Sequence, residues 1–245
     1  MNTYQADLHI HTILSPCGDL QMSPKNIIAE AAKKGLDIIG ITDHNSTRQS
    51  RLIKKLGEKE GIFVLCGAEL TSKEEAHCLV FMPDDESLAL LQAFLDTNLP
   101  NIQNDVNQFG YQVCVDEKEN IVFEEPRLLI SAINKSIKEI QELTYSLGGI
   151  FIPAHVNRPR YSIISQLGFI PDDLLVDALE LSRHITRAEF IKQNRYLEKY
   201  NFISNSDAHF VNDVGAVNTL LQMEMRSFEE LKMALNGLDG RKIIY

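Results

Sequence analysis

The chain has 245 residues and a formal net charge of -10 at pH 7. This length is sufficient to bury the core of one α/β domain. The acidic balance argues against long nucleic acid as a partner, since phosphate contacts need a basic surface. A small anionic substrate remains compatible if bound metal ions supply positive charge. The N-terminus lacks the charged and apolar regions of a signal peptide, and no apolar run approaches the ~20 residues of a membrane span, so we expect a cytoplasmic protein without a membrane partner.

The four cysteines give no sign of a disulfide framework. They form no Cys-x-x-Cys pair, and a chain of this length does not need covalent cross-links to fold. Cys66 and Cys78 lie in apolar runs and are expected in the core. We therefore expect reduced thiols.

Strands and helices alternate along the chain. Apolar runs of strand length occur at 6–12, 36–42, 62–66, 77–82, 150–154, 176–181 and 202–206, with a last short strand at 216–221. Helices are predicted at 24–34, 46–60, 84–94, 133–147, 186–199 and 227–235. The region 84–130 reads as an insertion, because after its first helix residues 96–130 show no clean period, and we expect further helical pieces there.

This alternation predicts parallel strands joined by right-handed crossovers. Roughly seven such units in one domain, 1–245, favour a closed or distorted β/α barrel over an open sheet. In such barrels the chemistry gathers at the C-terminal ends of the strands. Polar side chains directly after the predicted strands are therefore the candidates for a functional site.

The first strand carries the clearest signal. Asp7, His9 and His11 share one face because alternate side chains of an extended segment point the same way. Two imidazoles about 6–7 Å apart can reach one metal ion, with the carboxylate behind them to orient or ligate. Taken alone, the pattern fits an exposed polar strand face equally well.

The remaining histidines extend this signal. Most of the seven lie on, just after or at the start of an apolar strand, and carboxylates accompany them. Imidazoles and carboxylates that converge at one barrel mouth would hold zinc, manganese or iron, and the lack of paired cysteines excludes a thiolate-rich structural zinc site. The histidines are His9, His11, His44, His77, His155, His184 and His209, and the carboxylates are Asp7, Asp43, Glu69 and Asp207.

The segments DLHIHT, ITDHN, GAE, HCLV, PAHVN and SDAH follow one another between residues 6 and 209. In this order they resemble the PHP (polymerase and histidinol phosphatase) family of metal-dependent phosphoesterases. The resemblance implies a distorted (β/α)7 TIM-like barrel and a site for three divalent transition-metal ions. It implies a first ion held by His9, His11, Glu69 and Asp207, a second held by Glu69, His77 and His155, and a third held by His44 and His209.

One segment departs from the family pattern. The family continues DLHxHTxxSDGxxxP, with the Asp after Ser as a ligand of the third ion. Here Ser15 is followed by Pro16-Cys17-Gly18, and only then by Asp19. Counted back from Pro24, Asp19 falls at the family's separation, so we expect Asp19 as the displaced ligand. Cys17 is the rival, and its thiolate would favour zinc and alter the redox sensitivity of the site.

Other candidates have weaker roles. Asp7 is expected to orient a histidine, and Asp43 to cap the following turn more than to ligate. His184 lies outside the implied ligand set and is expected at a pocket rim or in a structural role. Arg158 and Arg183 follow two predicted strands and are candidates to hold a substrate phosphate, with surface ion pairs as the alternative.

We expect a metal-activated water to hydrolyse a small phosphorylated metabolite, with Asp207 and His209 among the catalytic residues and Asp207 as a candidate proton carrier. Three alternatives remain open. The first is a phosphodiesterase or exonuclease that acts on short oligonucleotides or nucleotide bisphosphates. The others are an amidohydrolase-type hydrolase and a non-catalytic metal-binding regulatory domain.

Overall fold

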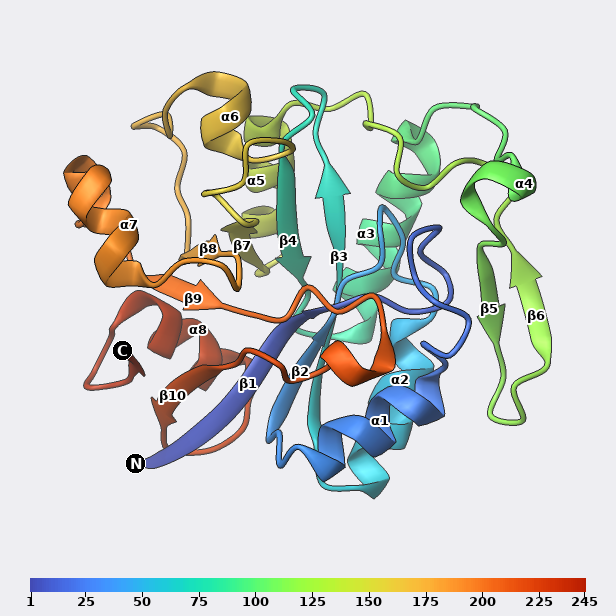
Figure 1. Cartoon of the computed structure of the whole chain (residues 1–245), viewed down its shortest axis with the longest axis horizontal. Coiled ribbons are helices and arrows are strands. Elements are labelled where there is room, and N and C mark those ends of the chain that lie inside the picture. Colours follow the sequence, from blue (N-terminus) through green and yellow to red (C-terminus); the bar gives the residue numbers. More distant parts are fainter.

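A curled mixed sheet of seven strands runs through the molecule (Figure 1), in a computed structural model that describes all 245 residues. The strand order is β11-β10-β1-β2-β3-β4-β7. Its middle, from β1 to β7, supports the site described below. The bounds are β1 (Asn2–Ile10), β2 (Ile38–Ile41), β3 (Phe63–Thr71), β4 (His77–Phe81), β7 (Ile150–Pro153), β10 (Thr219–Met223) and β11 (Lys242–Ile244).

Two further strands connect β7, at one end of this curled sheet, back to β1. β8 (Leu179–Leu181) and β9 (Phe202–Ser204) form a parallel pair. Val156, after β7, donates to the Glu180 carbonyl at 2.8 Å, and the Ala208 amide, after β9, donates to the His9 carbonyl at 3.1 Å. These bonds link β7 to β8 and β9 to β1. The expected fold, a distorted β/α barrel, is confirmed, and β10 and β11 extend the sheet beyond it.

Besides β10 and β11, which join the sheet antiparallel to their neighbours, one strand of the barrel itself runs against the expected parallel order. β4 is antiparallel to both β3 and β7. Only residues 72–76 separate β3 from β4, and the Ser72 amide donates to the Ala76 carbonyl at 2.9 Å. This connection is far too short for the crossover that a parallel pair needs. The start of β4 therefore lies at the same edge as the C-terminal ends of β3 and β7, which is where His77 stands.

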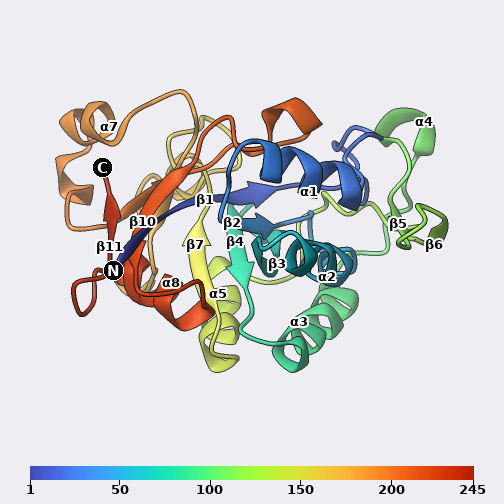
Figure 2. The ribbon, with the colours of Figure 1, turned by 90° about the horizontal axis from the view of Figure 1, so that it is seen from below.

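Helices cover the sheet, and Figure 2 shows α3, α5 and α8 along one side of it. Ser136 and Glu139 form a capping box at the start of α5, and Ser23 with Pro24 begins α1, as expected. None of the helices has the length and apolar character needed to cross a membrane. The bounds are α1 (Pro24–Lys33), α2 (Ser50–Lys59), α3 (Asp85–Asn98), α5 (Ile137–Ser146), α6 (Ile163–Leu167), α7 (Arg187–Gln193), α8 (Phe228–Asn236), and the 3-10 turns η1 (Arg195–Leu197) and η2 (Val211–Asp213).

The insertion-like region differs from its prediction. After α3 it holds a single helical turn, α4 (Val106–Phe109), and then a hairpin of β5 (Val113–Val115) and β6 (Ile121–Glu124), which lies at the side of the molecule in Figure 1. The Gln49 side chain ties this hairpin to the barrel, since its oxygen accepts from the Val115 amide at 2.8 Å. Such contacts support our proposal that residues 1–245 form one domain.

Candidate metal centre

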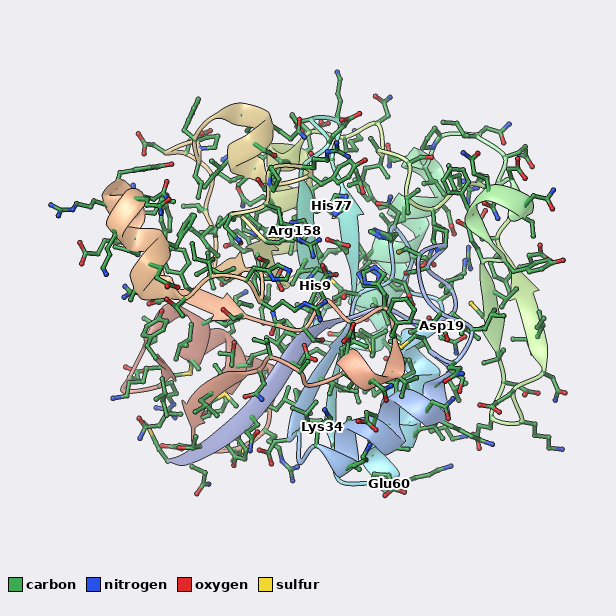
Figure 3. The ribbon with its side chains drawn as sticks, in the orientation of Figure 1. His9, Asp19, Lys34, Glu60, His77 and Arg158 are labelled. Atoms are coloured by element: carbon green, nitrogen blue, oxygen red, sulfur yellow. The ribbon has the colours of Figure 1, made fainter.

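The polar ends of the barrel strands converge on one site. Figure 3 shows His9, His77 and Arg158 near the middle of the molecule, where the strand ends meet. Here a cavity of about 270 Å³ is lined by His44, Glu69, His77, His155, Asp207 and His209, together with Cys17, Ile130, Arg158 and Tyr161. The strand face formed by Asp7, His9 and His11 is fully buried, which excludes the reading of an exposed polar strand. Buried polar groups need partners, and the partners define the chemistry here.

Hydrogen bonds fix the orientation of the first two imidazoles. His9 Nδ1 lies 3.0 Å from both carboxylate oxygens of Glu180. His11 Nδ1 lies 3.0 Å from the Ser15 hydroxyl, which itself donates to Asp43 at 2.7 Å. Both Nδ1 atoms are thus assigned the ring proton, and both Nε2 atoms are left as acceptors. The two Nε2 atoms face each other at 3.2 Å, an arrangement that a shared cation stabilises.

The Glu69 carboxylate faces imidazoles on two sides. Its Oε2 lies 3.4 Å from His11 Nε2 and 3.2 Å from His44 Nδ1. Its Oε1 lies 2.8 Å from His77 Nδ1 and 3.1 Å from His155 Nε2. Glu69 is buried, so an unpaired charge there would be costly. Glu69 would therefore help to hold metal ions on either side of it, with His9 and His11 in one group and His44 and His77 in the other.

Asp207 completes the wall opposite Glu69. Its Oδ1 lies 3.4 Å from His9 Nε2 and 3.5 Å from His11 Nε2, and its Oδ2 lies 2.5 Å from an Arg158 guanidinium nitrogen. Its backbone is in the left-handed region (φ 53°), a strain of order 1–3 kcal/mol that the surrounding contacts must hold. His209 donates from Nδ1 to the Asp207 carbonyl at 2.8 Å, so its Nε2 is an acceptor.

Side-chain donor atoms come close enough to hold ions in three groups. The atoms of each group lie within 4.8 Å of one another. We propose these residues, with His155 and Asp207, as the metal ligands, because neutral imidazole and carboxylate suit zinc, manganese and iron. The groups are His9 with His11 and Glu69, His44 with Glu69 and His77, and His11 with Cys17, His44 and His209.

Asp19, the expected ligand of the third ion, lies outside all three groups. Its carboxylate accepts from the Gln21 amide at 2.8 Å, and Figure 3 shows it to the side of His9 and His77. The structure instead places Cys17 with the imidazoles.

The charges of the site favour cations at its centre. Burial lowers the pKa of His11, but the carboxylates of Asp207 and Glu69 outweigh it and raise that pKa to about 9. Burial raises the pKa of Glu69, yet the surrounding imidazoles hold it well below its usual value. Burial also lowers the pKa of His209, to about 4. The carboxylates therefore stay ionised and stabilise positive charge at the imidazoles, whether it comes from protons or from metal ions.

Glu180 is a functional residue that the sequence analysis missed. Its carboxylate pairs with His9 and also accepts from the His155 amide at 2.9 Å and the Asn205 side chain at 2.8 Å. It therefore orients a ligand on each side of the site. Burial raises its pKa, but His9 prevails and keeps that pKa low. The available signal was a carboxylate inside an apolar strand, β8, where a charge is rare unless it is paired.

Asp7 and Asp43 hold loops in place. Asp7 accepts from the Ser206 amide at 3.0 Å, the Ser206 hydroxyl at 2.6 Å and the Gly215 amide at 2.8 Å, next to Asp207. Burial raises its pKa to about 6 despite these bonds. Asp43 accepts from the Thr12 amide at 2.7 Å and from the Ser15 hydroxyl. Neither belongs to a metal group, and their contacts differ from those expected, since Asp7 bonds to no histidine ring and Asp43 bonds to the loop after β1 instead of capping the following turn.

The two candidate phosphate-binding arginines separate. Arg158 lines the cavity over the metal centre. Arg183 lines a different cavity of about 640 Å³ beside α7, with His184, and its guanidinium lies 3.4 Å from Asp213. Of the two, the structure brings only Arg158 to the candidate site.

Glu180→Gln is expected to lower metal affinity about 10- to 100-fold, because His9 would lose the carboxylate that fixes its tautomer. Competition with a fluorescent chelator measures this change. Glu198→Gln, an exposed carboxylate, is the matched control and should leave the affinity unchanged. Equal metal affinities in the two variants would show that Glu180 does not orient His9 for metal binding.

The sequence model of the PHP domain family matches residues 7–198. The chain belongs to this family. The PHP family comprises hydrolases that use divalent metal ions, so the expected family of metal-dependent hydrolases is confirmed.

Similar proteins support the fold. The uncharacterised protein YqxK of Bacillus subtilis (strain 168) is 28% identical over 277 residues, an alignment that covers all of this chain and 65% of YqxK. The lesion-specific endonuclease PfuEndoQ of Pyrococcus furiosus superposes with a TM-score of 0.75 at 23% identity, over 99% of this chain and 58% of its own. Endonuclease Q in complex with a 27-mer duplex substrate gives 0.70 at 23% identity, over 98% and 58%. The chain thus spans less than two thirds of the length of these relatives.

This last structure corrects one expectation. The acidic net charge led to the exclusion of long nucleic acid, yet an endonuclease Q of the same fold was solved with duplex DNA that carries an abasic lesion at the active site. The exclusion was wrong because net charge averages over the whole surface. A duplex contacts only part of that surface, and metal ions can neutralise the phosphate where it binds.

Proposed function

We propose that the PHP domain hydrolyses a phosphodiester bond of a nucleic acid strand at a centre of three divalent ions, drawn from zinc, manganese and iron. The observation that carries this proposal is the position of Glu69 between two groups of imidazoles, in the wall of the cavity that Arg158 also lines. Paired ions are the recurring device for in-line displacement at phosphorus. The likeness to a nuclease solved with its DNA substrate supports nucleic acid as the substrate class.

The chain's own residues have distinct roles in this proposal. Bound metal ions supply Lewis acidity and lower the pKa of a coordinated water toward about 7. Glu180 and Ser15 fix the ring orientation of His9 and His11. The side chain of Arg158 is 39% exposed, so its guanidinium can turn from Asp207 to a phosphoryl oxygen of the substrate.

Asp207 and His209 remain the proposed catalytic residues. Burial raises the pKa of Asp207, but His9 and His11 outweigh it and hold that pKa far below its usual value, so the carboxylate is ionised. It can therefore ligate a cation, whereas so low a pKa makes it a weak proton acceptor. His209 lines the cavity, and its Nδ1 lies 3.6 Å from this carboxylate and donates to the Asp207 carbonyl, which leaves Nε2 as an acceptor.

The size of the cavity limits how a strand can bind. About 270 Å³ accommodates a phosphate with part of one nucleoside, so the rest of a strand would run along the rim. Tyr161, whose ring stacks on His77 at a centroid distance of 5.0 Å, is half exposed and forms part of that rim. An aromatic ring there suits a sugar or base.

A small phosphorylated metabolite is the second candidate substrate. The small cavity and the net charge of -10 favour it, because Arg158 is the only Arg or Lys that lines the cavity. Monoester hydrolysis requires the same metal centre. The two candidates differ only in what lies beyond the reacting phosphate.

A hydrolysis panel with Mn²⁺ or Zn²⁺ tests the proposal. It contains labelled single-stranded DNA, duplex DNA with and without an abasic site, nucleotide bisphosphates, phosphomonoesters and amides. We expect strand cleavage, and a loss of at least ~10³-fold in His9→Ala, since a ligand of the reacting centre is removed. Glu198→Gln should retain full activity. Release of phosphate from metabolites alone would favour the second candidate, and hydrolysis of amides alone would contradict both.

A further inference from the structure

We propose that the thiolate of Cys17 is a metal ligand of this chain and takes the place expected for Asp19. With His44 and His209 it would hold one ion through two nitrogen donors and one sulfur donor, beside His11 of the neighbouring ion group. The inference deepens the proposed function, because it concerns the metal centre on which that function rests.

The geometry fits a single tetrahedral ion. The donor atoms of these four residues lie within 4.8 Å of one another, and Cys17, His44 and His209 line the same cavity. Zinc bonds of about 2.0–2.1 Å to nitrogen and 2.3 Å to sulfur place ligand atoms roughly 3.3–3.7 Å apart. Binding of an ion would have to draw the donors of Cys17, His44 and His209 together from a separation of up to 4.8 Å.

A second observation points independently to a ligand here. His44 Nδ1 is buried and makes no hydrogen bond, although the Glu69 carboxylate lies 3.2 Å away, an arrangement that a cation held between them would satisfy. A buried polar atom without a partner costs about 1–3 kcal/mol, and a bound cation would remove that cost. The rings of His11 and His209 are also oriented to bind metal ions, since their Nδ1 atoms form hydrogen bonds and their Nε2 atoms are left as acceptors.

The backbone of the loop holds Cys17 in position. The Gly18 amide donates to the Ser15 carbonyl at 2.9 Å, and the Asp19 amide donates to the His209 carbonyl at 2.9 Å. A Cβ on Gly18 would lie 2.3 Å from the Thr12 carbonyl oxygen, so only glycine allows this close approach. The inserted turn thus brings Cys17 over the site, while the carboxylate of Asp19 bonds to its own loop.

A thiolate changes which ion binds. Sulfur favours zinc, cobalt and cadmium over manganese and magnesium, which prefer oxygen ligands. The other three thiols, Cys66, Cys78 and Cys114, are buried, whereas Cys17 is exposed. Cys17 can therefore be addressed selectively by a thiol reagent.

Cobalt substitution tests the proposal without an activity assay. The full chain, Cys17→Ser and Asp19→Asn are each titrated with Co²⁺. We expect a sulfur-to-cobalt charge-transfer band in the near ultraviolet for the full chain and for Asp19→Asn. Cys17→Ser should lose that band and about one equivalent of bound cobalt per chain.

Alkylation of the unmodified chain gives a readout that survives if Cys17→Ser fails to fold. Zn²⁺ should protect Cys17 from iodoacetamide, since a coordinated sulfur is a poor nucleophile, and the site of labelling is read by mass spectrometry. Loss of bound cobalt in Asp19→Asn but not in Cys17→Ser would overturn the proposal, as would labelling of Cys17 at equal rates with and without Zn²⁺. A cobalt–sulfur band in a chain that hydrolyses no phosphate ester would support Cys17 as a ligand and reject the proposed function.

Discussion

Glu69→Gln is expected to abolish hydrolysis, with a loss of at least ~10³-fold. It should also reduce the metal content of the two groups that contain Glu69, the one with His9 and the one with His77. The amide is neutral and offers one acceptor atom, whereas the carboxylate contacts His11 and His44 with one oxygen and His77 and His155 with the other. The buried imidazoles would then lack a counter-charge. Elemental analysis and the hydrolysis panel, run on the same sample, measure both effects.

Glu60→Gln is the matched control for this variant, because Glu60 is exposed and lies far from His9 in Figure 3. Circular dichroism shows whether Glu69→Gln retains the fold. A folded Glu69→Gln chain with full metal content and full activity would remove the bridging carboxylate from the mechanism.

Gly67→Ala is expected to destabilise the barrel by about 3 kcal/mol, at the upper end for overpacking. A Cβ on Gly67 would lie 2.0 Å from the Val80 carbonyl oxygen and 2.7 Å from the Phe81 ring. Gly67 pairs with Phe81 between β3 and β4, so the clash would spread these strands next to Glu69. Urea unfolding, followed by circular dichroism, measures the change in the free energy of unfolding.

Gly61→Ala separates this clash from ordinary backbone strain. Gly61 has a positive φ of 71° and open space around its Cβ position, so alanine there should cost only about 1–2 kcal/mol. An unfolding midpoint for Gly67→Ala equal to that of the unmodified chain would show that β3 and β4 can separate without cost, against the close packing described here.

The sequence was sufficient to predict the barrel and its family, because local patterns carried both. Apolar runs of strand length and the polar residues after them can be read without tertiary contacts. His77 was harder to interpret, since a histidine at the start of a strand has no obvious place at the C-terminal ends of the others. Its position depends on the antiparallel direction of β4, which the short link 72–76 imposes.

Other features depend on contacts that no local pattern encodes. Glu180 acquires its role only when the barrel closes and its side chain on β8 meets His9 of β1. The position of Cys17 over the site follows from a glycine that packs on the Thr12 carbonyl, which spacing alone did not reveal. Arg183 follows a strand as Arg158 does, but its side chain lines a separate cavity. The hairpin of β5 and β6 escaped prediction because its strands are only a few residues long and β6 is mostly exposed.

We propose above all that this chain holds several catalytic metal ions. Elemental analysis of protein purified without chelator tests it most directly. We expect at least about two equivalents of zinc, manganese or iron per chain, because paired ions are needed to clamp a phosphoryl group. Less than about one equivalent, in protein that also fails to take up added Zn²⁺ or Mn²⁺, would contradict the account.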